Sequence, residues 1–340
     1  MKRLLIIGPN PQNIGGISCH IKRLVGLIEG NYDIDFIDEG HTRYEGYFNL
    51  RGGNLFYYLK KVVNADIVHI HSGVWFLRIF HVIICKFLFR KKVLVTIHRD
   101  PNIEPYRKIT RWFLRYCDCS ILVNKEGYDF IKSTDTGKCV LLPAFLPPLM
   151  KDEPQLPNEL ENWLKVARKN PKSYIMCSNA WNLVLHNGFD LYGLDICIDA
   201  MERLKTDETN YCLIFIVASN TNQRERIEEY KRRVKDYGLE RNILIWEEPV
   251  SFVRLLQKCD LTLRTTNTDG DAISIRESLY FDKPVLASDI VSRPDGVAVF
   301  KTRNINDLVR MIKEITNRTF VLKKDMKIDY QKMFLEMYEK

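Results

Sequence analysis

The sequence predicts an α/β protein built from two doubly wound domains of similar size. Apolar, strand-like runs alternate with amphipathic, helix-like stretches along the chain, and a proline-rich segment divides this alternation into two halves. The length of 340 residues also fits two domains of ordinary size. Regular alternation of strands and helices is typical of parallel sheets that carry helices on both faces.

The first half, residues 1–150, opens with a strand. Residues 3–8, RLLIIG, form a continuous apolar run, as expected for a strand buried on both faces of a sheet. Residues 15–30 then repeat apolar side chains at helical spacing. Four further strands are predicted in this half, at YDIDFID (32–38), ADIVHIHS (65–72), KVLVTIH (92–98) and CSILVN (119–124). This pattern predicts a Rossmann-like N-terminal domain.

Proline marks the division between the halves. Residues 143–171 hold Pro143, Pro147, Pro148, Pro154, Pro157 and Pro171, nearly half of all the prolines. Proline interrupts both strand ladders and helix interiors. We therefore expect a linker over residues 151–170, with a short helix at NELENWLKVARKN (158–170).

The second half, residues 171–318, repeats the alternation. Its predicted strands are YIMCSNA (174–180), YCLIFIVAS (211–219), NILIWEE (242–248), DLTLRTT (260–266) and PVLASD (284–289). Residues 319–340 are expected to form a tail ending in an amphipathic helix.

Charge and cysteine content narrow the classes of partner. The net charge of +8 is a modest excess that suits an anionic small molecule or an anionic membrane face as well as nucleic acid. Because the sequence carries no RNA-binding or helix-turn-helix signature, we expect that nucleic acid is not a partner.

The nine cysteines are scattered, which indicates buried thiols in a reducing cytoplasm. The short apolar run at the start of the sequence predicts a strand rather than a signal peptide.

Two stretches leave membrane contact open. Residues 75–89 are too short and too often interrupted by basic side chains to span a bilayer. Residues 78–92 and 106–117 nevertheless mix aromatic and basic side chains, as do helices that rest on an anionic membrane. The alternative is that they are buried helices with solvated basic faces.

In the first half, candidate site residues stand at the ends of predicted strands, where open α/β sheets bind ligands. Gly15 and Gly16 join a strand to a helix, which suits an anion but equally an ordinary loop. His98 ends a strand and can face the ligand edge, or it is a surface histidine. His69 and His71 share one strand face; with no further ligand near them in sequence, we expect packing and no metal site.

In the second half the candidates surround TDGDAISIRESL, residues 268–279. Asp269 and Glu277 stand eight positions apart around a loop that turns into a helix. Gly270 permits the turn, Asp271 suits the N-cap, and the amides of residues 272–274 should face the loop.

Two carboxylates around free amides fit a ligand with charged oxygens at its centre and hydroxyls at each end, as in a nucleotide sugar. The alternative is a capped helix with an exposed glutamate. Arg264, at the end of strand 260–266, also requires an anion, either a diphosphate or a neighbouring carboxylate.

With these residues, the chain resembles the retaining glycosyltransferases often called "glycosyl transferases group 1", which have the GT-B fold. The hallmark of this family is two acids in the pattern E-x7-E followed by a glycine-proline strand, and residues 269–289 align with this motif without a gap. Four further segments match in order along the rest of the chain: GGISCHIKRL, ADIVHIHS, VTIH and LYGLDICIDA. The resemblance implies two Rossmann-like domains facing across a cleft, with the last helix returning to the N-terminal domain. It also implies that the N-terminal domain binds the acceptor and the C-terminal domain binds the nucleotide sugar.

The resemblance also implies roles for single residues. Glu277 matches the acid that holds the ribose hydroxyls, and Asp269 matches the acid that contacts the donor sugar. The amides of Ala272 and Ile273 match those that touch sugar and phosphate. Gly15 and Gly16 match the loop near the diphosphate. His98 matches the histidine near the transferred sugar.

The chain departs from the family pattern in two places. Asp269 stands where the family has a glutamate, which is longer by one methylene. The family's arginine and lysine, which neutralise the leaving diphosphate, are missing, and Tyr192 occupies the lysine position. We expect Arg264 to supply the cation, with Arg276 and His186 as the next candidates.

The expected function is that of a cytoplasmic, retaining hexosyltransferase. It would move a sugar from a UDP- or GDP-sugar to a saccharide or lipid-linked acceptor during assembly of surface polysaccharide, such as capsule or lipopolysaccharide, or of glycolipid. We expect no metal and no other cofactor, and peripheral contact with the inner face of the plasma membrane. Two alternatives are a non-catalytic partner of another transferase and a sugar-nucleotide epimerase of the same fold.

Overall fold

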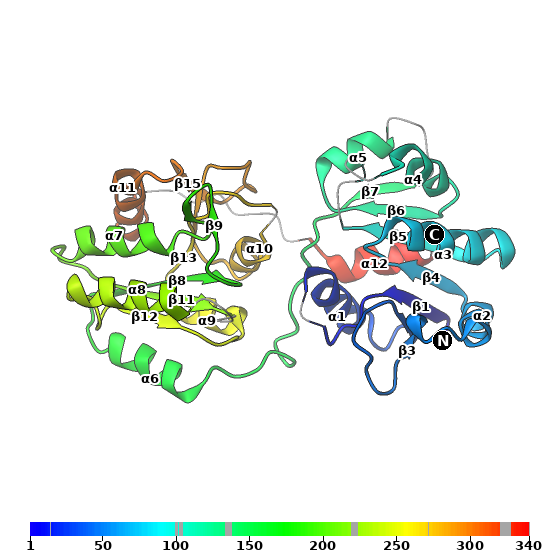
Figure 1. Ribbon diagram of the computed structural model, residues 1–340, viewed down its shortest axis with the longest axis horizontal. Helices are drawn as coiled ribbons and strands as arrows, with labels where there is room; N and C mark the ends of the chain where they lie inside the picture. The colour runs from blue at the N-terminus through cyan, green and yellow to red at the C-terminus, as the bar shows by residue number, and fades with distance from the viewer. Residues whose placement is uncertain are drawn as a thin grey trace. The chain divides into compact units, whose positions relative to one another are not determined.

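A computed structural model describes residues 1–13, 15–98, 101, 105–132, 138–218, 224–270, 272–319 and 328–339. The chain divides into two compact units (Figure 1). The first unit comprises Met1–Leu149 and Ile328–Lys340, and the second comprises Met150–Lys327.

Within its described residues, the first unit contains a parallel sheet of seven strands in the order β3-β2-β1-β4-β5-β6-β7. The order reverses between β1 and β4, which is the doubly wound arrangement that places ligands at the carboxyl ends of those two strands. The strands are β1 (Arg3–Gly8), β2 (Asp33–Asp38), β3 (Phe48–Asn49), β4 (Ile67–Ile70), β5 (Lys92–Ile97), β6 (Cys119–Leu122) and β7 (Cys139–Leu141).

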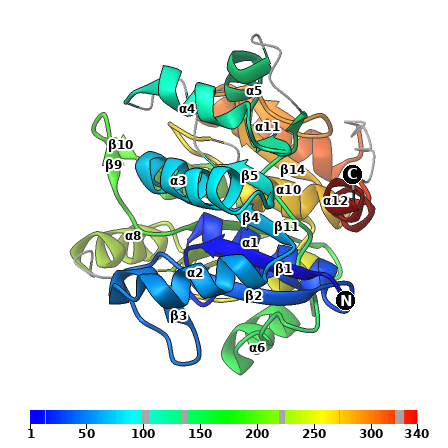
Figure 2. The ribbon, with the colours of Figure 1, turned by 90° about the vertical axis from the view of Figure 1, so that its right-hand side faces the viewer.

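Alternate residues of each strand point to opposite faces of this sheet. Leu5 and Ile7 of β1 pack in the core beneath four helices, whose ribbons can be followed in Figure 2. These helices are α2 (Leu55–Asn64), α3 (Trp75–Val82), α4 (Arg107–Leu114) and α5 (Lys125–Lys132). A short 3-10 helix, η1 (Leu50–Gly52), precedes α2, and a π-helical turn, η2 (Ile83–Leu88), extends α3.

The last helix of the chain, α12 (Tyr330–Glu339), belongs to the first unit. It lies beside α1 (Gly16–Ile28), as Figure 1 shows in red and dark blue, and Gln331 donates a hydrogen bond to the Leu27 carbonyl (2.8 Å). Phe334 and Tyr338 are fully buried. The predicted return of the C-terminal helix to the N-terminal domain is confirmed.

The second unit repeats the same topology in its described residues. Six parallel strands follow the order β12-β11-β8-β13-β14-β15, so the order reverses between β8 and β13. The strands are β8 (Ser173–Ala180), β11 (Asn210–Val217), β12 (Ile243–Trp246), β13 (Leu261–Arg264), β14 (Val285–Ser288) and β15 (Ala298–Phe300). A separate antiparallel pair, β9 (Leu185–His186) and β10 (Phe189–Asp190), follows β8.

Helices cover both faces of this sheet too. One core lies under α7 (Leu194–Leu204), α8 (Arg224–Asp236) and α11 (Ile305–Thr316), and the other under α6 (Asn158–Ala167) and α9 (Phe252–Lys258). Leu160 and Leu164 of α6 are buried in the second core. Residues 151–170, expected as a linker, are therefore part of the second unit, because the helix between the prolines carries an apolar face that packs on the sheet.

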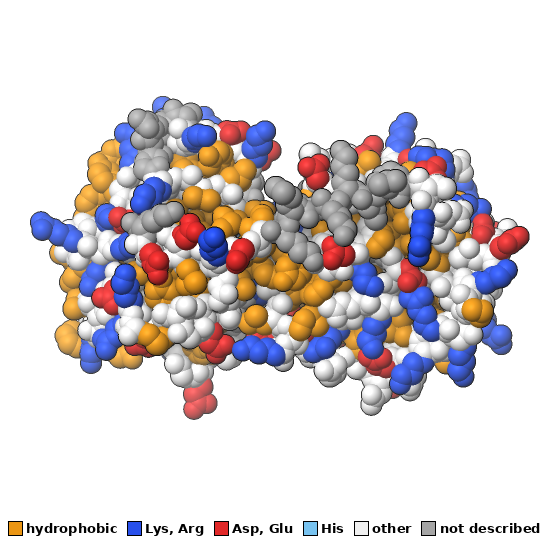
Figure 3. Space-filling model, turned by 180° about the vertical axis from the view of Figure 1, so that it is seen from behind, with side chains coloured by type: hydrophobic (Ala, Val, Ile, Leu, Met, Phe, Trp, Pro, Cys, Tyr) orange, Lys and Arg blue, Asp and Glu red, His pale blue; other side chains and the backbone are white. Residues whose placement is uncertain are grey.

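The described helices include none that is long and apolar enough to cross a bilayer. Lys and Arg side chains are spread over the face shown in Figure 3, with hydrophobic side chains between them. All nine cysteines are free thiols, and seven of them are buried.

Candidate functional site

In the second unit, the candidate residues gather at the carboxyl ends of β13 and β14. Arg264 is the last residue of β13, and Asp269 lies in the loop between β13 and α10 (Ile273–Tyr280). Arg293 follows β14, which pairs with β13 in parallel. This edge adjoins the reversal of strand order, where doubly wound sheets bind their ligands.

The Asp269 carboxylate is enclosed by hydrogen-bond donors. Arg264 binds it in a bidentate manner, with Nε 3.0 Å from Oδ2 and Nη2 2.8 Å from Oδ1. Arg293 donates from Nη1 to Oδ2 (2.8 Å), and the Thr266 hydroxyl donates to the same oxygen (3.1 Å). Of the two partners left open for Arg264, the structure therefore shows the neighbouring carboxylate, and that carboxylate is the predicted catalytic acid.

Arg293 was missed by the sequence analysis. Its side chain is 3% exposed and is fixed by two bonds besides the one to Asp269, from Nε to the Ser288 carbonyl (2.9 Å) and from Nη2 to the Ser288 hydroxyl (3.1 Å). An arginine beside proline in a loop of the sequence gives no signal of such a role. Only the pairing of β13 with β14 brings it to Asp269.

The two arginines control the charge of Asp269. Burial acts to raise the pKa of the Asp269 carboxyl, but the hydrogen bonds and positive charges of Arg264 and Arg293 outweigh it and lower the pKa below its usual value. The three side chains carry one net positive charge between them. An anionic ligand at this edge would therefore meet a cationic environment.

Arg264 also contacts Tyr192, which the resemblance matches to a lysine. Its guanidinium carbon lies 5.3 Å from the centre of the Tyr192 ring, within the range of a cation–π contact. The loop that carries Tyr192 is tied to the end of β13, since Thr265 donates from Oγ1 to the Tyr192 carbonyl (2.8 Å). The side chain of Arg264 remains 13% exposed, so this cation reaches the surface of the unit.

The helix after Asp269 starts one residue later than predicted. Ala272 occupies the N-cap position, and no side-chain cap is found for α10 among the described residues. The expected N-cap, Asp271, lies outside the described residues. The first turn of a helix leaves amides without intrahelical acceptors, so Ile273 and the following residues present donors here. A Cβ built on Gly270 would meet no described atom within 4 Å, so the loop is open on that side.

The other predicted residues of this unit take varied positions. Glu277 lies in the second turn of α10 and is buried, which corrects the alternative of an exposed glutamate. Arg276 lies on the same helix. His186 lies in β9 with its Nε2 3.3 Å from the Asn187 amide nitrogen, and its carbonyl accepts a hydrogen bond from Asn267 (3.2 Å).

In the first unit, Gly16 is the first residue of α1 and Gly15 is its N-cap, in the connection that follows β1. Among the described residues, a Cβ at either position would meet nothing within 4 Å, and no side chain caps the helix. Steric crowding inside the protein therefore does not explain this pair. The space beside it is available to a ligand.

His98 follows β5 at the same edge and joins a group of imidazoles. Its Nε2 lies 3.2 Å from Nδ1 of His71, and its ring centre is 4.9 Å from that of His20. Among the described residues, these three histidines are the group whose ligand atoms could together hold a metal ion. Burial, followed by the charges of neighbouring histidines, holds the pKa of His98 well below its usual value.

His69 behaves differently, as the packing interpretation predicts. Its Nδ1 lies 2.6 Å from the Tyr338 hydroxyl of α12, and its Nε2 lies 2.8 Å from the Thr96 hydroxyl. Both ring nitrogens are satisfied by the fold itself. Burial lowers the pKa of His69 to about 3, so the ring is neutral.

A basic and aromatic surface lies on α4. It borders a hollow of about 480 Å³ lined by Arg107, Lys108, Arg111, Trp112, Arg115 and Phe130. Trp112 and Tyr116 are exposed, their rings are 5.0 Å apart, and the exposed Phe87 of η2 lies 4.8 Å from Tyr116. We refer to these eight side chains as the α4 surface.

Comparison with solved structures identifies the fold. The chain is similar to Anabaena Alr3699/HepE in complex with UDP, at 13% identity over 94% of this chain and 91% of that one, with a TM-score of 0.65. It is also similar to a glycosyltransferase from Rickettsia africae ESF-5 (14% identity, 94% and 89% coverage, TM-score 0.62) and to sucrose-phosphate synthase from Thermosynechococcus elongatus (13%, 93% and 90%, 0.58). No family model and no curated protein matches the sequence. The likeness shows that the chain has the GT-B fold predicted from its sequence.

Proposed function

We propose that this chain is a retaining glycosyltransferase that moves a sugar from a nucleotide-sugar donor to a saccharide or lipid-linked acceptor. The observation that carries the proposal is the cluster of Arg264, Asp269 and Arg293 at the carboxyl edge of the second sheet, beside the open first turn of α10. A cationic cluster next to free amides suits the diphosphate of a donor.

The donor would extend along α10. Glu277 would accept hydrogen bonds from the ribose hydroxyls, because a carboxylate binds a vicinal diol strongly. The amides of Ala272 and Ile273 would contact the diphosphate and the sugar. Asp269 would contact the sugar through the hydrogen-bond acceptor positions that its bonds to the arginines leave unused. Alternatively, Arg264 would leave Asp269 and bind the diphosphate when the donor binds.

The main contribution of the protein to this reaction would be to stabilise the charge that develops in the transition state. When the anomeric bond breaks, the sugar becomes oxocarbenium-like and negative charge grows on the departing diphosphate. Arg264 and the α10 amides would meet that charge, and for this reason we propose transfer that needs no metal. Retention would follow from attack of the acceptor on the face that the diphosphate leaves, with the leaving phosphate taking the acceptor's proton. His98 would line the position of the transferred sugar.

We propose a UDP-sugar as the first donor to test, with GDP-sugars next. The support is that structures of the similar Anabaena protein contain UDP and UDP-glucose. The acceptor would be a saccharide or a lipid-linked saccharide of surface polysaccharide or glycolipid assembly.

The α4 surface supports peripheral contact with the inner face of the plasma membrane by a cytoplasmic protein. Four basic side chains, Arg107, Lys108, Arg111 and Arg115, would meet anionic headgroups there, and exposed aromatic rings such as that of Trp112 suit the interface.

Donor turnover with purified protein tests the proposal. The protein is incubated with a panel of UDP- and GDP-hexoses, and release of nucleoside diphosphate and the sugar product are both measured. Wild type should release the diphosphate from one donor class, Glu277→Gln should weaken donor binding, and Glu314→Gln, at a partly exposed position of α11, should match wild type.

The other outcomes identify the alternatives. An altered sugar that is still attached to its nucleotide would identify an epimerase. Donor binding without any turnover, with or without a saccharide acceptor, would identify a non-catalytic partner. Absence of binding to the whole panel would refute the proposal.

A further inference from the structure

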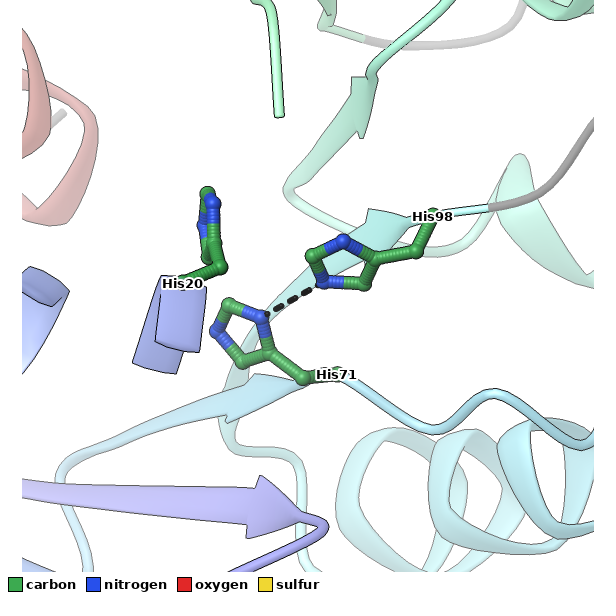
Figure 4. A group of neighbouring side chains, drawn as sticks. All are labelled: His20, His71 and His98. Carbon is green, nitrogen blue, oxygen red and sulfur yellow. Dashed lines mark hydrogen bonds between the residues drawn. The ribbon is translucent and has the colours of Figure 1, made fainter. Parts of the chain in front are cut away.

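The histidines around His98 form a second arrangement that the proposed transfer does not use as a whole. His20 lies on α1, His71 directly follows β4, and His98 directly follows β5 (Figure 4). Strands β1, β4 and β5 are neighbours in the sheet. The three imidazoles therefore meet at the carboxyl edge, beside the reversal of strand order in the first unit.

We propose that His20, His71 and His98 form a binding site for a late first-row divalent cation, with Zn²⁺ as the type ion. The three available nitrogens, one from each ring, lie within 4.8 Å of one another. His71 Nδ1 and His98 Nε2 are 3.2 Å apart. Two nitrogens on one tetrahedral Zn²⁺ are about 3.3 Å apart, given Zn–N bonds of about 2.0–2.1 Å. Two of the ligands thus already have the required separation, and His20 needs a small movement.

The ring nitrogen of His20 that would not bind the metal, Nδ1, makes the kind of hydrogen bond that is usual in metal-binding histidines. Its Nδ1 donates to the Ala144 carbonyl (2.7 Å), because a carbonyl can only accept. Nε2 therefore carries a lone pair. Ligating histidines commonly donate their other N–H to a backbone carbonyl, which fixes the tautomer and the orientation of the ring.

The ligand nitrogen of His20 is left unsatisfied by the rest of the described protein. Its Nε2 is buried without a hydrogen-bond partner. Unsatisfied buried polar atoms are uncommon, and a bound ion is one of their ordinary explanations. The contrast with His69 is direct, since that neighbour has both nitrogens paired and is excluded as a ligand.

The ligand set also indicates which ions would bind. Three imidazoles without a carboxylate suit Zn²⁺, Cu²⁺ or Ni²⁺ and disfavour Mg²⁺ and Ca²⁺, which prefer oxygen. A three-histidine set leaves a fourth position for water or another ligand.

The site is distinct from the metal-free transfer proposed above. A metal held by these residues would occupy the imidazole of His98, so we expect Zn²⁺ to inhibit transfer and chelation to leave transfer intact. Binding itself is measured without any sugar. Failure of the metal site and failure of the proposed function are therefore separate results.

Metal titration of the full-length protein tests this inference. Protein stripped with EDTA is titrated with Zn²⁺ by calorimetry, and with Co²⁺ by visible absorption. Wild type should bind one equivalent and show the intense visible bands of tetrahedral Co²⁺, without the near-ultraviolet band of thiolate ligation that a site made by the cysteines would give.

Variants identify the ligands. His20→Ala and His98→Ala should weaken binding by about 100-fold or more, whereas His186→Ala in the second unit should bind as wild type does. His20→Gln keeps a polar side chain, and Zn²⁺ should raise the Tm of wild type but not that of this variant, which guards against misfolding. No saturable binding by folded wild type, thiolate bands in the cobalt spectrum, or undiminished affinity in both alanine variants would overturn the inference.

Discussion

Arg264 places its guanidinium carbon 5.3 Å from the ring centre of Tyr192, the residue that stands where the resembling glycosyltransferases have a lysine. The guanidinium at the end of β13 thus lies over the aromatic ring of the loop in which those enzymes carry a positive charge. The same arginine holds the shorter of the two acids by a bidentate ion pair. One side chain therefore links both departures from the family pattern.

Exchange of these two residues tests whether Arg264 took over the role of the lysine. Arg264→Ala should lower turnover of the donor by about 100-fold, because one preorganised cation is lost from the leaving group. The double variant Arg264→Ala/Tyr192→Lys should recover about tenfold of this loss by returning an ammonium to the loop. Exposed Arg310→Ala is the control. Unchanged donor affinity and turnover in Arg264→Ala would rule out the role.

Removal of Arg293 should destabilise the second unit. Arg293→Met leaves the buried Asp269 carboxylate and Ser288 without three hydrogen bonds, at a cost of about 3 kcal/mol. The matched control is Arg310→Met, since Arg310 pairs with Asp307 and Glu314 on the exposed face of α11 and should contribute little. Calorimetry should show a drop of several degrees in Tm for Arg293→Met alone, and equal melting curves would contradict the assignment.

Acid should remove the stabilisation that Asp269 provides. Because the folded-state pKa of Asp269 lies below that of the unfolded chain, its contribution is complete above about pH 4 and is lost as the pH falls further. We expect Asp269→Asn to be less stable than wild type at pH 7, with the difference shrinking towards pH 3. Urea unfolding across this range measures it, with surface Asp236→Asn as the control. A difference that is the same at every pH would be inconsistent with the lowered pKa.

The contact between Tyr338 and His69 should be worth a measurable part of the first unit's stability. Tyr338→Phe removes the hydroxyl 2.6 Å from His69 Nδ1 and leaves a buried nitrogen unpaired, at a cost of about 1–2 kcal/mol. Tyr116→Phe, at an exposed position, should cost almost nothing. Thermal unfolding of the two variants compares them directly, and equal stability would show that the hydroxyl is dispensable.

The α4 surface should bind anionic vesicles. Replacing Arg107 and Lys108 with Glu should weaken cosedimentation with phosphatidylserine-containing liposomes at least fivefold for each position, given about 1 kcal/mol for each basic side chain near such a membrane. Trp112→Ser should weaken it further through loss of an interfacial anchor. The matched control is Arg232→Glu with Lys235→Glu on α8. Wild-type protein that stays in the supernatant at low salt would disprove membrane contact.

The sequence predicted the long elements well because their signals are strong. The apolar run of β1 and the helical spacing of α1 need no tertiary information. The short strands β3, β7 and β15 were not predicted, because a strand of two or three residues shows no periodicity. The helix in the proline-rich segment was expected but its packing was not, since proline marks breaks in the chain without showing which surface the intervening helix covers.

The sequence could relate candidate site residues that are close together in the chain, but not those that are distant in sequence. Asp269, Glu277 and Arg264 stand within one segment, so spacing and chemistry could relate them. Arg293 and the grouping of His20 with His98 depend on the pairing of strands that are distant in sequence. The N-cap is Ala272, one residue after the expected position.

The position of α12 also has a consequence for biosynthesis. The first sheet to leave the ribosome receives Phe334 and Tyr338 only after the whole second unit has been made. Until then, the face of β4 and β5 that these rings cover stays open to solvent, to chaperones or to neighbouring nascent chains. The half that is translated first should therefore be the half that matures last.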